Sequence, residues 1–231
     1  IEMSTTDEEE LRRLTVLVNE TGAKVAECPV SGGCHRADTG NISIFAGTSD
    51  RNTFEEILPL LTHLGRRALH TGDIGTASTL KVMTNYLATV NLISCCEAMT
   101  TMKAAGIDMG ICYEAMKISS GTSFVHETES QLILSGSRDV NFTMDLILKD
   151  IGLFQKIADK KNVPLEVSPL IIDIMSDGAK RYGQRAQTDR IIERLEEATG
   201  LSILADGFPK ELIDDEPEER GYEVRAPQSQ S

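Results

Sequence analysis

Residues 75–96 restrict the fold more than any other stretch, because GTASTLKVMTNYLATVNLISCC contains a single charged residue, Lys81. Side chains three and four positions apart lie on the same face of a helix. A helix with so little charge on any face is buried on nearly all sides in a globular protein. We therefore expect a long buried helix here, with one apolar stripe formed by Leu80, Met83, Leu87 and Val90.

Lys81 requires an explanation, since burial lowers the pKa of an ammonium group that has no partner. Asn85 follows one helical turn later, so the two side chains project from the same face. A lysine with a lowered pKa can take and return a proton, and a neighbouring amide can orient a hydroxyl group. The pattern indicates either an acid–base site or a lysine whose stem packs while its ammonium group reaches water.

A second lysine interrupts an apolar pattern in the helix expected over residues 142–162. Lys149 stands where the stripe predicts an apolar side chain, and Asp150 beside it is open to interpretation as a surface acid. Two lysines at inward-facing positions suggest that both address one anionic ligand. The other members of this stripe are Phe142, Leu146, Leu153 and Ile157.

Two short loops could contribute to a binding site. In PVSGG, residues 29–33, the backbone N–H groups of Ser31, Gly32 and Gly33 could receive a carboxylate, although glycines after a strand are also common in ordinary turns. SSGTS, residues 119–123, is equally open to two interpretations. It is either a substrate loop or the end of one helix and the start of the next.

The chain changes character near residues 72–75. Before this point helices alternate with strands, which is typical of an α/β layer, whereas from Gly75 onward the pattern predicts helices and no strand. We expect domains at 1–73 and 74–205, followed by an acidic, proline-containing mobile tail at 206–231. The expected strands are 23–30, 41–47 and 66–72, and the expected helices are 6–22, 50–65, 75–105, 108–118, 123–135, 142–162 and 167–199.

Composition excludes several classes of function. A net charge of −13 argues against nucleic acid or an anionic membrane as a partner, and 4% aromatic residues without Trp leave little for base stacking. No eighteen consecutive residues are apolar, so no membrane span is expected. The five cysteines lack C-x-x-C spacing and have no ligand spacing with the four histidines. We therefore expect no metal site, and reduced thiols in a cytoplasmic protein.

Four motifs in order along residues 1–195 resemble the β-hydroxyacid dehydrogenase family. That family includes 3-hydroxyisobutyrate dehydrogenase and tartronate semialdehyde reductase, and is related to 6-phosphogluconate dehydrogenase. The motifs are MSTTD, CPVSGG, GDIGTASTLKVMTN and FTMDLILKDIGL. No single motif is decisive, but four in register make the resemblance strong.

The resemblance implies the C-terminal part of an NAD(P)-binding Rossmann-like domain, followed by an all-helical substrate and dimerisation domain. It implies an NAD- or NADP-dependent oxidoreductase, a homodimer or homotetramer, that oxidises a small 3-hydroxy acid or reduces the corresponding semialdehyde. Lys81 would be the general acid/base. The other implied roles are substrate binding by Ser31, Gly32, Gly33, Asn85, Gly121 and Ser123, and cofactor binding by Thr5, Lys149 and Asp150.

The chain also departs from the family pattern. Glu27-Cys28 replaces the usual Asp-Ala, Ala77 replaces a Gly, and Thr84-Asn85 replaces two Asn. The family's Gly-x-Gly-x-x-Gly turn would lie upstream of these residues, so we expect the chain as given to bind cofactor poorly or not at all. A non-catalytic helical dimerisation module, or a small-acid-binding module derived from the family, is the alternative.

Overall fold

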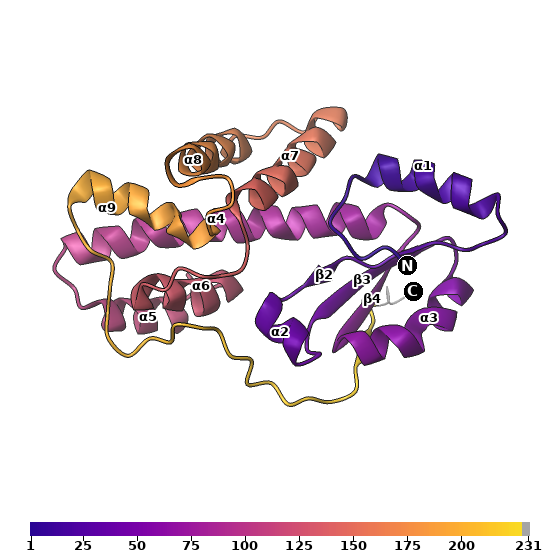
Figure 1. Ribbon diagram of the computed structural model, residues 1–231, viewed down its shortest axis with the longest axis horizontal. Coiled ribbons are helices and arrows are strands. Elements are labelled where there is room, and N and C mark those ends of the chain that lie inside the picture. The colour runs from indigo at the N-terminus through magenta and orange to yellow at the C-terminus, as the bar shows by residue number, and fades with distance from the viewer. Residues whose placement is uncertain (228–231) are drawn as a thin grey trace. The chain divides into compact units, whose positions relative to one another are not determined.

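The computed structural model describes residues 1–227, which form two compact units. The first unit contains Ile1–Met83 together with the segment from Ile213, and the second contains Thr84–Leu212. Helix α4, Thr76–Ala104, begins in the first unit and continues into the second (Figure 1). The units therefore divide inside a helix, between Met83 and Thr84, whereas the change in sequence pattern indicated a boundary at 73–74, just before that helix begins.

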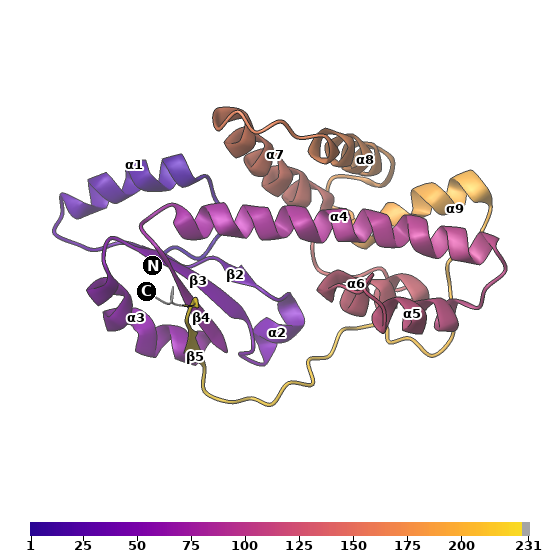
Figure 2. The ribbon, with the colours of Figure 1, turned by 180° about the vertical axis from the view of Figure 1, so that it is seen from behind.

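A mixed sheet forms the centre of the first unit. Its strand order is β1-β3-β4-β5, and β2 also pairs with β3. Strand β3 runs antiparallel to β1 and β2 and parallel to β4, while β5 runs parallel to β4 (Figure 2). The strands are β1 Ala26–Glu27, β2 Val30–Ser31, β3 Ser43–Thr48, β4 Arg67–Gly72 and β5 Tyr222–Val224, and the helices are α1 Glu8–Asn19, α2 Cys34–Asp38 and α3 Arg51–Leu64.

Local sequence explains several of these elements. Asp50 begins α3 by accepting a hydrogen bond from Thr53 N at 2.8 Å, which satisfies an amide that has no partner within the helix. Pro29 divides the predicted strand 23–30 into β1 and β2, because proline cannot donate to a ladder. The core under α3 consists of fully buried residues: Ile44, Ala46, Phe54, Leu61 and Ala68.

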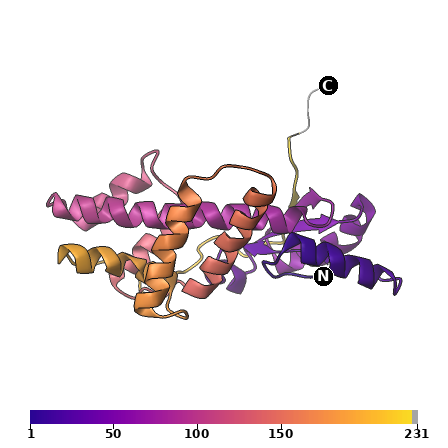
Figure 3. The ribbon, with the colours of Figure 1, turned by 90° about the horizontal axis from the view of Figure 1, so that it is seen from above.

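The second unit is helical. Its helices are α5 Met109–Lys117, α6 Phe124–Ser135, α7 Met144–Lys160, α8 Val167–Tyr182, the 3₁₀ helix η1 Thr188–Ile192 and α9 Glu193–Thr199. Helices α7 and α8 pack side by side (Figure 3). The prediction of one helix over 167–199 is wrong, because α8 ends at Gly183, whose φ of +104° lies outside the helical region.

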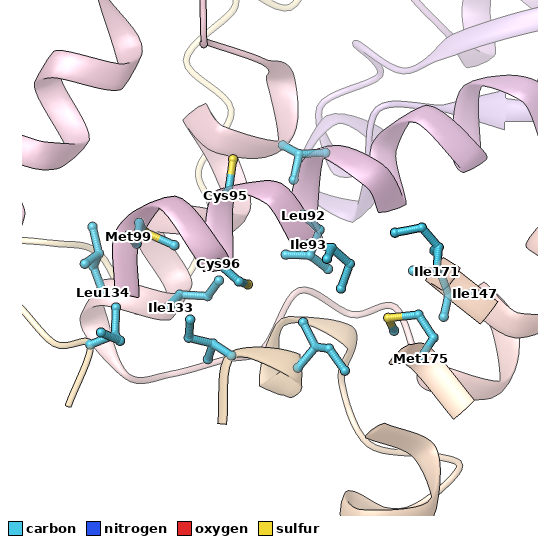
Figure 4. Close-up of a cluster of buried hydrophobic side chains, with 14 of the residues drawn as sticks. Leu92, Ile93, Cys95, Cys96, Met99, Ile133, Leu134, Ile147, Ile171 and Met175 are labelled. Atoms are coloured by element: carbon cyan, nitrogen blue, oxygen red, sulfur yellow. The ribbon is translucent and has the colours of Figure 1, made fainter. Parts of the chain in front are cut away.

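The core of the second unit forms where the later turns of α4 contact α6, α7 and α8 (Figure 4). Leu92, Cys96 and Met99 of α4 are each at most 2% exposed. Cys96 is a free thiol, as are the other four cysteines. Burial of this kind contributes on the order of 2 kcal/mol per large side chain. The labelled partners from the other helices are Ile133, Leu134, Ile147, Ile171 and Met175.

The segment from Ile213 differs from the expected mobile tail without strands. Strand β5 lies in it and extends the sheet beyond β4, with Leu69 opposite Val224. Its acids pair with arginines of the first unit, which offsets the ordering of an acidic segment. The ion pairs are Asp214 and Glu216 with Arg36, Glu216 with Arg67, Glu219 with Arg66, and Glu223 with Arg51.

Candidate active site

Lys81 lies in the second turn of α4 and is only 7% exposed. The sequence correctly predicted the helix, and of the two interpretations left open for Lys81 the low exposure favours the buried one. The expectation that the helix is buried on nearly all sides is wrong, because Leu80 and Leu87 are 42% and 58% exposed. Lys81 is therefore a charged side chain on a buried face of a helix that exposes apolar side chains elsewhere.

Glu27 holds the start of the same helix, a role that the sequence did not reveal. Its side chain is 1% exposed and accepts four hydrogen bonds from Gly75, Ala77 and Ser78. The first N–H groups of a helix lack partners within the helix and carry partial positive charge, so a carboxylate is well placed there. The available signal was an acid inside a short strand, AKVAECPV, where a buried position usually takes an apolar residue.

Cys28, the other departure in this strand, is fully buried. Burial raises the pKa of its thiol to about 12. Since the thiolate is the reactive form, Cys28 is inert at neutral pH and acts as a packing residue.

In the second unit, Asn85 and Asp150 are in direct contact. Asn85 Nδ2 donates a hydrogen bond to Asp150 Oδ2 at 2.6 Å, which joins α4 to α7. Lys149 Nζ lies 3.2 Å from Asp150 Oδ1. The structure thus brings three predicted site residues together, with the carboxylate between the amide and the ammonium group.

The predicted inward face of α7 is wrong by one residue at this point. Asp150 is the buried member, at 2% exposed, whereas the side chain of Lys149 is 45% exposed. The helix carries two apolar stripes, and the one that packs is not the one that contains Lys149. The packed stripe consists of Met144, Ile147, Ile151, Phe154 and Ala158.

An aromatic pair holds α4 and α7 together next to this contact. The rings of Tyr86 and Phe154 stack with centroids 4.0 Å apart and planes 9° from parallel. Tyr86 follows Asn85, and Phe154 lies one turn after Asp150. This stacking restricts the separation of the two helices and so supports the geometry of the Asn85–Asp150 hydrogen bond.

Residues 29–33 lie in the first unit and contain β2 and the two glycines that lead into α2. Ser31 is the last residue of β2, opposite Ser43 of β3. Gly32 and Gly33 have φ values of +136° and +82°, a region that residues with a side chain rarely adopt. The two glycines are therefore required by the backbone itself, and the proposed contact with a substrate carboxylate remains a prediction.

The remaining predicted site residues have local partners or lie near helix ends. Ser123 begins α6, its Oγ accepting a hydrogen bond from His126 N at 3.0 Å, so the capping interpretation of this serine is confirmed. Gly121 is exposed, and its N–H donates to Ser119 Oγ at 3.2 Å. Thr5 is partly buried and precedes α1 by three residues.

Within residues 1–227, no three His, Cys, Asp or Glu side chains are grouped closely enough to hold a metal ion. No helix within the same residues is long and apolar enough to cross a membrane.

The first unit is a mixed sheet with covering helices, and the second is helical, which is consistent with part of a Rossmann-type layer followed by a helical domain. The family model described as the NAD-binding region of NADP-dependent 3-hydroxyisobutyrate dehydrogenase matches residues 75–195. The model of the NAD binding domain of 6-phosphogluconate dehydrogenase matches residues 1–72. The chain belongs to the β-hydroxyacid dehydrogenase family.

Relatives of established name support this assignment. The 2-(hydroxymethyl)glutarate dehydrogenase of Eubacterium barkeri is 30% identical over 204 residues, which are 88% of this chain and 67% of the relative. The L-threonate dehydrogenase of Escherichia coli is 27% identical over 71% of this chain, and the NAD-dependent L-serine dehydrogenase of Pseudomonas aeruginosa is 31% identical over 68%. The chain spans 54% and 55% of the length of these last two relatives.

Solved structures agree on the fold. The 3-hydroxyisobutyrate dehydrogenase of Salmonella typhimurium superposes with a TM-score of 0.75 at 23% identity, covering 83% of this chain and 67% of that structure. The 3-hydroxyisobutyrate dehydrogenase of Mycobacterium tuberculosis superposes with a TM-score of 0.72 at 20% identity, covering 83% and 68%. The expected fold class, a Rossmann-type layer followed by an all-helical domain, is confirmed.

Proposed function

We propose that this protein is an NAD- or NADP-dependent dehydrogenase of a small 3-hydroxy acid, or a reductase of the corresponding semialdehyde, with Lys81 as its general acid/base. The observation that carries the proposal is the burial of Lys81 in α4, in a chain whose relatives are named as dehydrogenases of hydroxy acids. A buried position usually takes an apolar residue, so a lysine there suggests a functional use, and oxidation of a hydroxyl group requires a residue that takes its proton.

In the oxidative direction Lys81 Nζ takes the proton of the substrate hydroxyl, and in reduction it returns a proton to the carbonyl oxygen. Asn85, one turn further along α4, orients that hydroxyl. Its hydrogen bond to buried Asp150 restricts rotation of the amide and so favours one orientation. We assign the substrate carboxylate to Ser31 and to the N–H groups of Gly32 and Gly33, because glycines carry no side chain of their own beside those amides.

The cofactor assignment rests on the exposed ammonium group of Lys149. The side chain of Lys149 extends from α7 into solvent, whereas that of Asp150 is buried. An exposed ammonium group can reach an anionic dinucleotide more readily than a buried one. NAD or NADP, when bound, accepts or supplies the hydride. We assign Thr5 to the nicotinamide side, and Gly121 and Ser123 to the substrate loop, on the family resemblance alone. A cytoplasmic homodimer or homotetramer remains our prediction.

Replacement of Lys81 by alanine tests the catalytic assignment. In the full-length protein, assayed with NAD or NADP and a panel of 3-hydroxy acids, Lys81→Ala should lower kcat by ~10²–10⁴-fold, which is the usual contribution of general acid/base catalysis. Lys103→Ala, in the last turn of the same helix, is the matched control and should leave kcat unchanged.

The alternative is a non-catalytic dimerisation or acid-binding module. That alternative predicts no turnover with any hydroxy acid, together with self-association or carboxylate binding that Lys81→Ala does not abolish. Turnover that persists unchanged in Lys81→Ala would remove the catalytic assignment even if the protein proves to be a dehydrogenase.

A further inference from the structure

We propose that Glu27 is a positioning residue for Lys81. Its carboxylate binds the first turn of α4 to the sheet and thereby sets where the lysine ammonium group lies. This inference rests on the proposed function, since it assigns Glu27 a role through Lys81. All the residues involved belong to the first compact unit.

The hydrogen bonds of Glu27 address both of its carboxylate oxygens. Oε1 accepts from Gly75 N at 2.5 Å and from Ala77 N at 2.9 Å. Oε2 accepts from Ser78 N at 3.1 Å and from Ser78 Oγ at 2.6 Å. Hydrogen bonds to an ionised acceptor are about twice as strong as neutral ones, and a first helical turn is where a negative charge is favoured. Four such contacts from three residues within the span 75–78 fix the start of the helix in position and in direction.

Ser78 connects the hydrogen bonds of Glu27 to Lys81. It precedes Lys81 by three residues, so the two side chains share a face of α4. A helix rises 1.5 Å per residue, which places the Cα of Lys81 ~4.5 Å along the axis from that of Ser78. Over so short a span a helix behaves as a rigid rod, and a shift of its first turn moves the lysine by a comparable amount.

The sheet in turn leaves space for the side chain of Glu27. Glu27 pairs with Gly47 of β3 in an antiparallel register. A Cβ atom on Gly47 would lie 2.3 Å from Glu27 Oε1, although the backbone of Gly47 does not require glycine. The glycine is therefore needed for space. It lets the longer glutamate side chain reach α4 from a strand that is itself held by β3.

Precise placement is the property that catalysis depends on. A displacement of about 1 Å of a reacting group can cost 10²-fold in rate, whereas binding of the substrate tolerates it better. Loss of the hydrogen bonds between Glu27 and the first turn of α4 should therefore lower kcat far more than it raises KM. A residue with a merely structural role would lower the amount of folded enzyme, while the enzyme that remains folded would keep its kcat.

The test uses the full-length protein with Glu27→Gln, Glu27→Asp and Ser78→Ala. Glu27→Gln keeps the shape but turns one acceptor into a donor facing N–H groups. We expect kcat to fall ~100-fold per folded active site, with KM within threefold of wild type. Glu27→Asp, which restores the carboxylate, should recover part of that loss. Glu56→Gln, at an exposed carboxylate that pairs with Lys24, is the matched control and should leave kcat unchanged.

Amide hydrogen exchange gives a readout that does not depend on turnover. In Glu27→Gln the amides of Gly75, Ala77 and Ser78 should exchange faster, while amides in α5 should not change. If Glu27→Gln does not fold, Ser78→Ala decides. It removes one hydrogen bond to Oε2, and a fall in kcat of ~5-fold supports the proposal.

Two results are distinguishable from each other. If Lys81→Ala abolishes turnover while Glu27→Gln, or Ser78→Ala in its place, keeps kcat within twofold of wild type, the positioning role of Glu27 is overturned and the catalytic lysine stands. If Lys81→Ala keeps full turnover, the proposed function itself fails, and the positioning role, which is defined through Lys81, fails with it.

Discussion

Both compact units bury acidic side chains, but the surroundings of Glu27 in the first unit and of Asp189 in the second are opposite in kind. In the first unit, Glu27 accepts four hydrogen bonds. In the second, Asp189 of η1 is fully buried, and none of residues 1–227 donates a hydrogen bond to either of its carboxylate oxygens or to buried Oε2 of Glu129 in α6. The same chemical group therefore acts as a helix anchor in one unit and as an unsatisfied polar group in the other.

The pKa values of the second pair follow from this lack of partners. Burial raises the pKa of Glu129 to about 8, and the nearby charge of Asp189 raises it further. Burial also raises the pKa of Asp189 to about 7, although the nearby backbone N–H groups of Asp189 and Arg190 and the guanidinium group of Arg138 oppose the change. A carboxyl group that has no donors lowers its cost of burial by keeping a proton. What decides the role of a buried acid is therefore the set of N–H groups around it.

The largest expected effect is a dependence of stability on pH that comes from Glu129 and Asp189. Between about pH 4 and pH 8 the folded protein holds protons that the unfolded chain releases, so the free energy of unfolding falls as pH rises. For Asp189 alone, whose pKa rises from 3.8 to about 7, the fall is on the order of 4 kcal/mol. Urea unfolding at a series of pH values measures it.

Amide substitutions identify the source of that slope. Asp189→Asn and Glu129→Gln together should remove most of the fall in the free energy of unfolding between pH 5 and pH 8, because neither amide titrates. Glu127→Gln, at an exposed acid of the same helix, should keep the wild-type slope. A slope that survives the double substitution would show that these two acids do not hold protons in the folded state.

A smaller effect is expected when Glu27 loses its carboxylate altogether. Glu27→Leu fills much of the same space but leaves the N–H groups of Gly75, Ala77 and Ser78 without their acceptor. We expect the free energy of unfolding to fall by about 3 kcal/mol, since unsatisfied buried donors cost about 1–3 kcal/mol and several are created together. Asp189→Leu should cost much less at pH 8, where it removes a poorly solvated acid. Equal losses for the two variants would contradict the comparison.

The smallest effect is expected at the ion pair between Glu223 and Arg51, because the arginine side chain is 40% exposed to solvent, although that of Glu223 is only 11% exposed. Glu223 binds both terminal nitrogens of Arg51 at 2.7 and 3.0 Å, and this contact lowers the pKa of Glu223. Its stabilising contribution is present above the ordinary pKa of 4.5 and is lost as pH falls, which is the opposite sign to that of Asp189.

A double-mutant cycle with Glu223→Gln and Arg51→Met should give a coupling of ~0.5 kcal/mol at low salt. We expect the coupling to weaken further in 0.5 M NaCl, where surface charges are screened over a few ångströms. A coupling of several kcal/mol would place this pair with the buried acids rather than with the surface pairs.

The parts of the fold that the sequence predicted are those with local causes. Helices α3, α5 and α6 begin at Asp50, Asp108 and Ser123, each of which accepts a hydrogen bond from the amide three residues later. The change from alternating elements to helices near Gly75 likewise follows from periodicity along the chain. The four motifs of the family resemblance identified the family in the same way, since each is a contiguous stretch.

Two errors in prediction have local causes, at Gly183 and at Pro29, and the others concern contacts between distant residues. Strand β5 forms because it pairs with the edge of β4 and because arginines of the first unit donate hydrogen bonds to acids of the segment that contains it. These partners lie more than 140 residues earlier in the chain. The buried face of α7 could not be chosen from sequence, because two apolar stripes differ by one residue and only packing against α4 and α8 selects between them. The sequence showed Glu27 only as a departure from the family motif. Its role at the start of α4 follows from hydrogen bonds to residues about 50 positions later in the chain.

The sequence by itself determined the order of the elements, the α/β and helical division, and the presence of a lysine on a buried helix face, because these follow from residue spacing over a few turns. Only the tertiary structure decided which charged groups meet. It placed Glu27 on the first turn of α4, Asp150 on Asn85, and Asp189 where no N–H group among the described residues reaches its carboxylate. Which charged groups interact depends on their distance in space, and burial determines the strength of each interaction because it lowers the local dielectric constant.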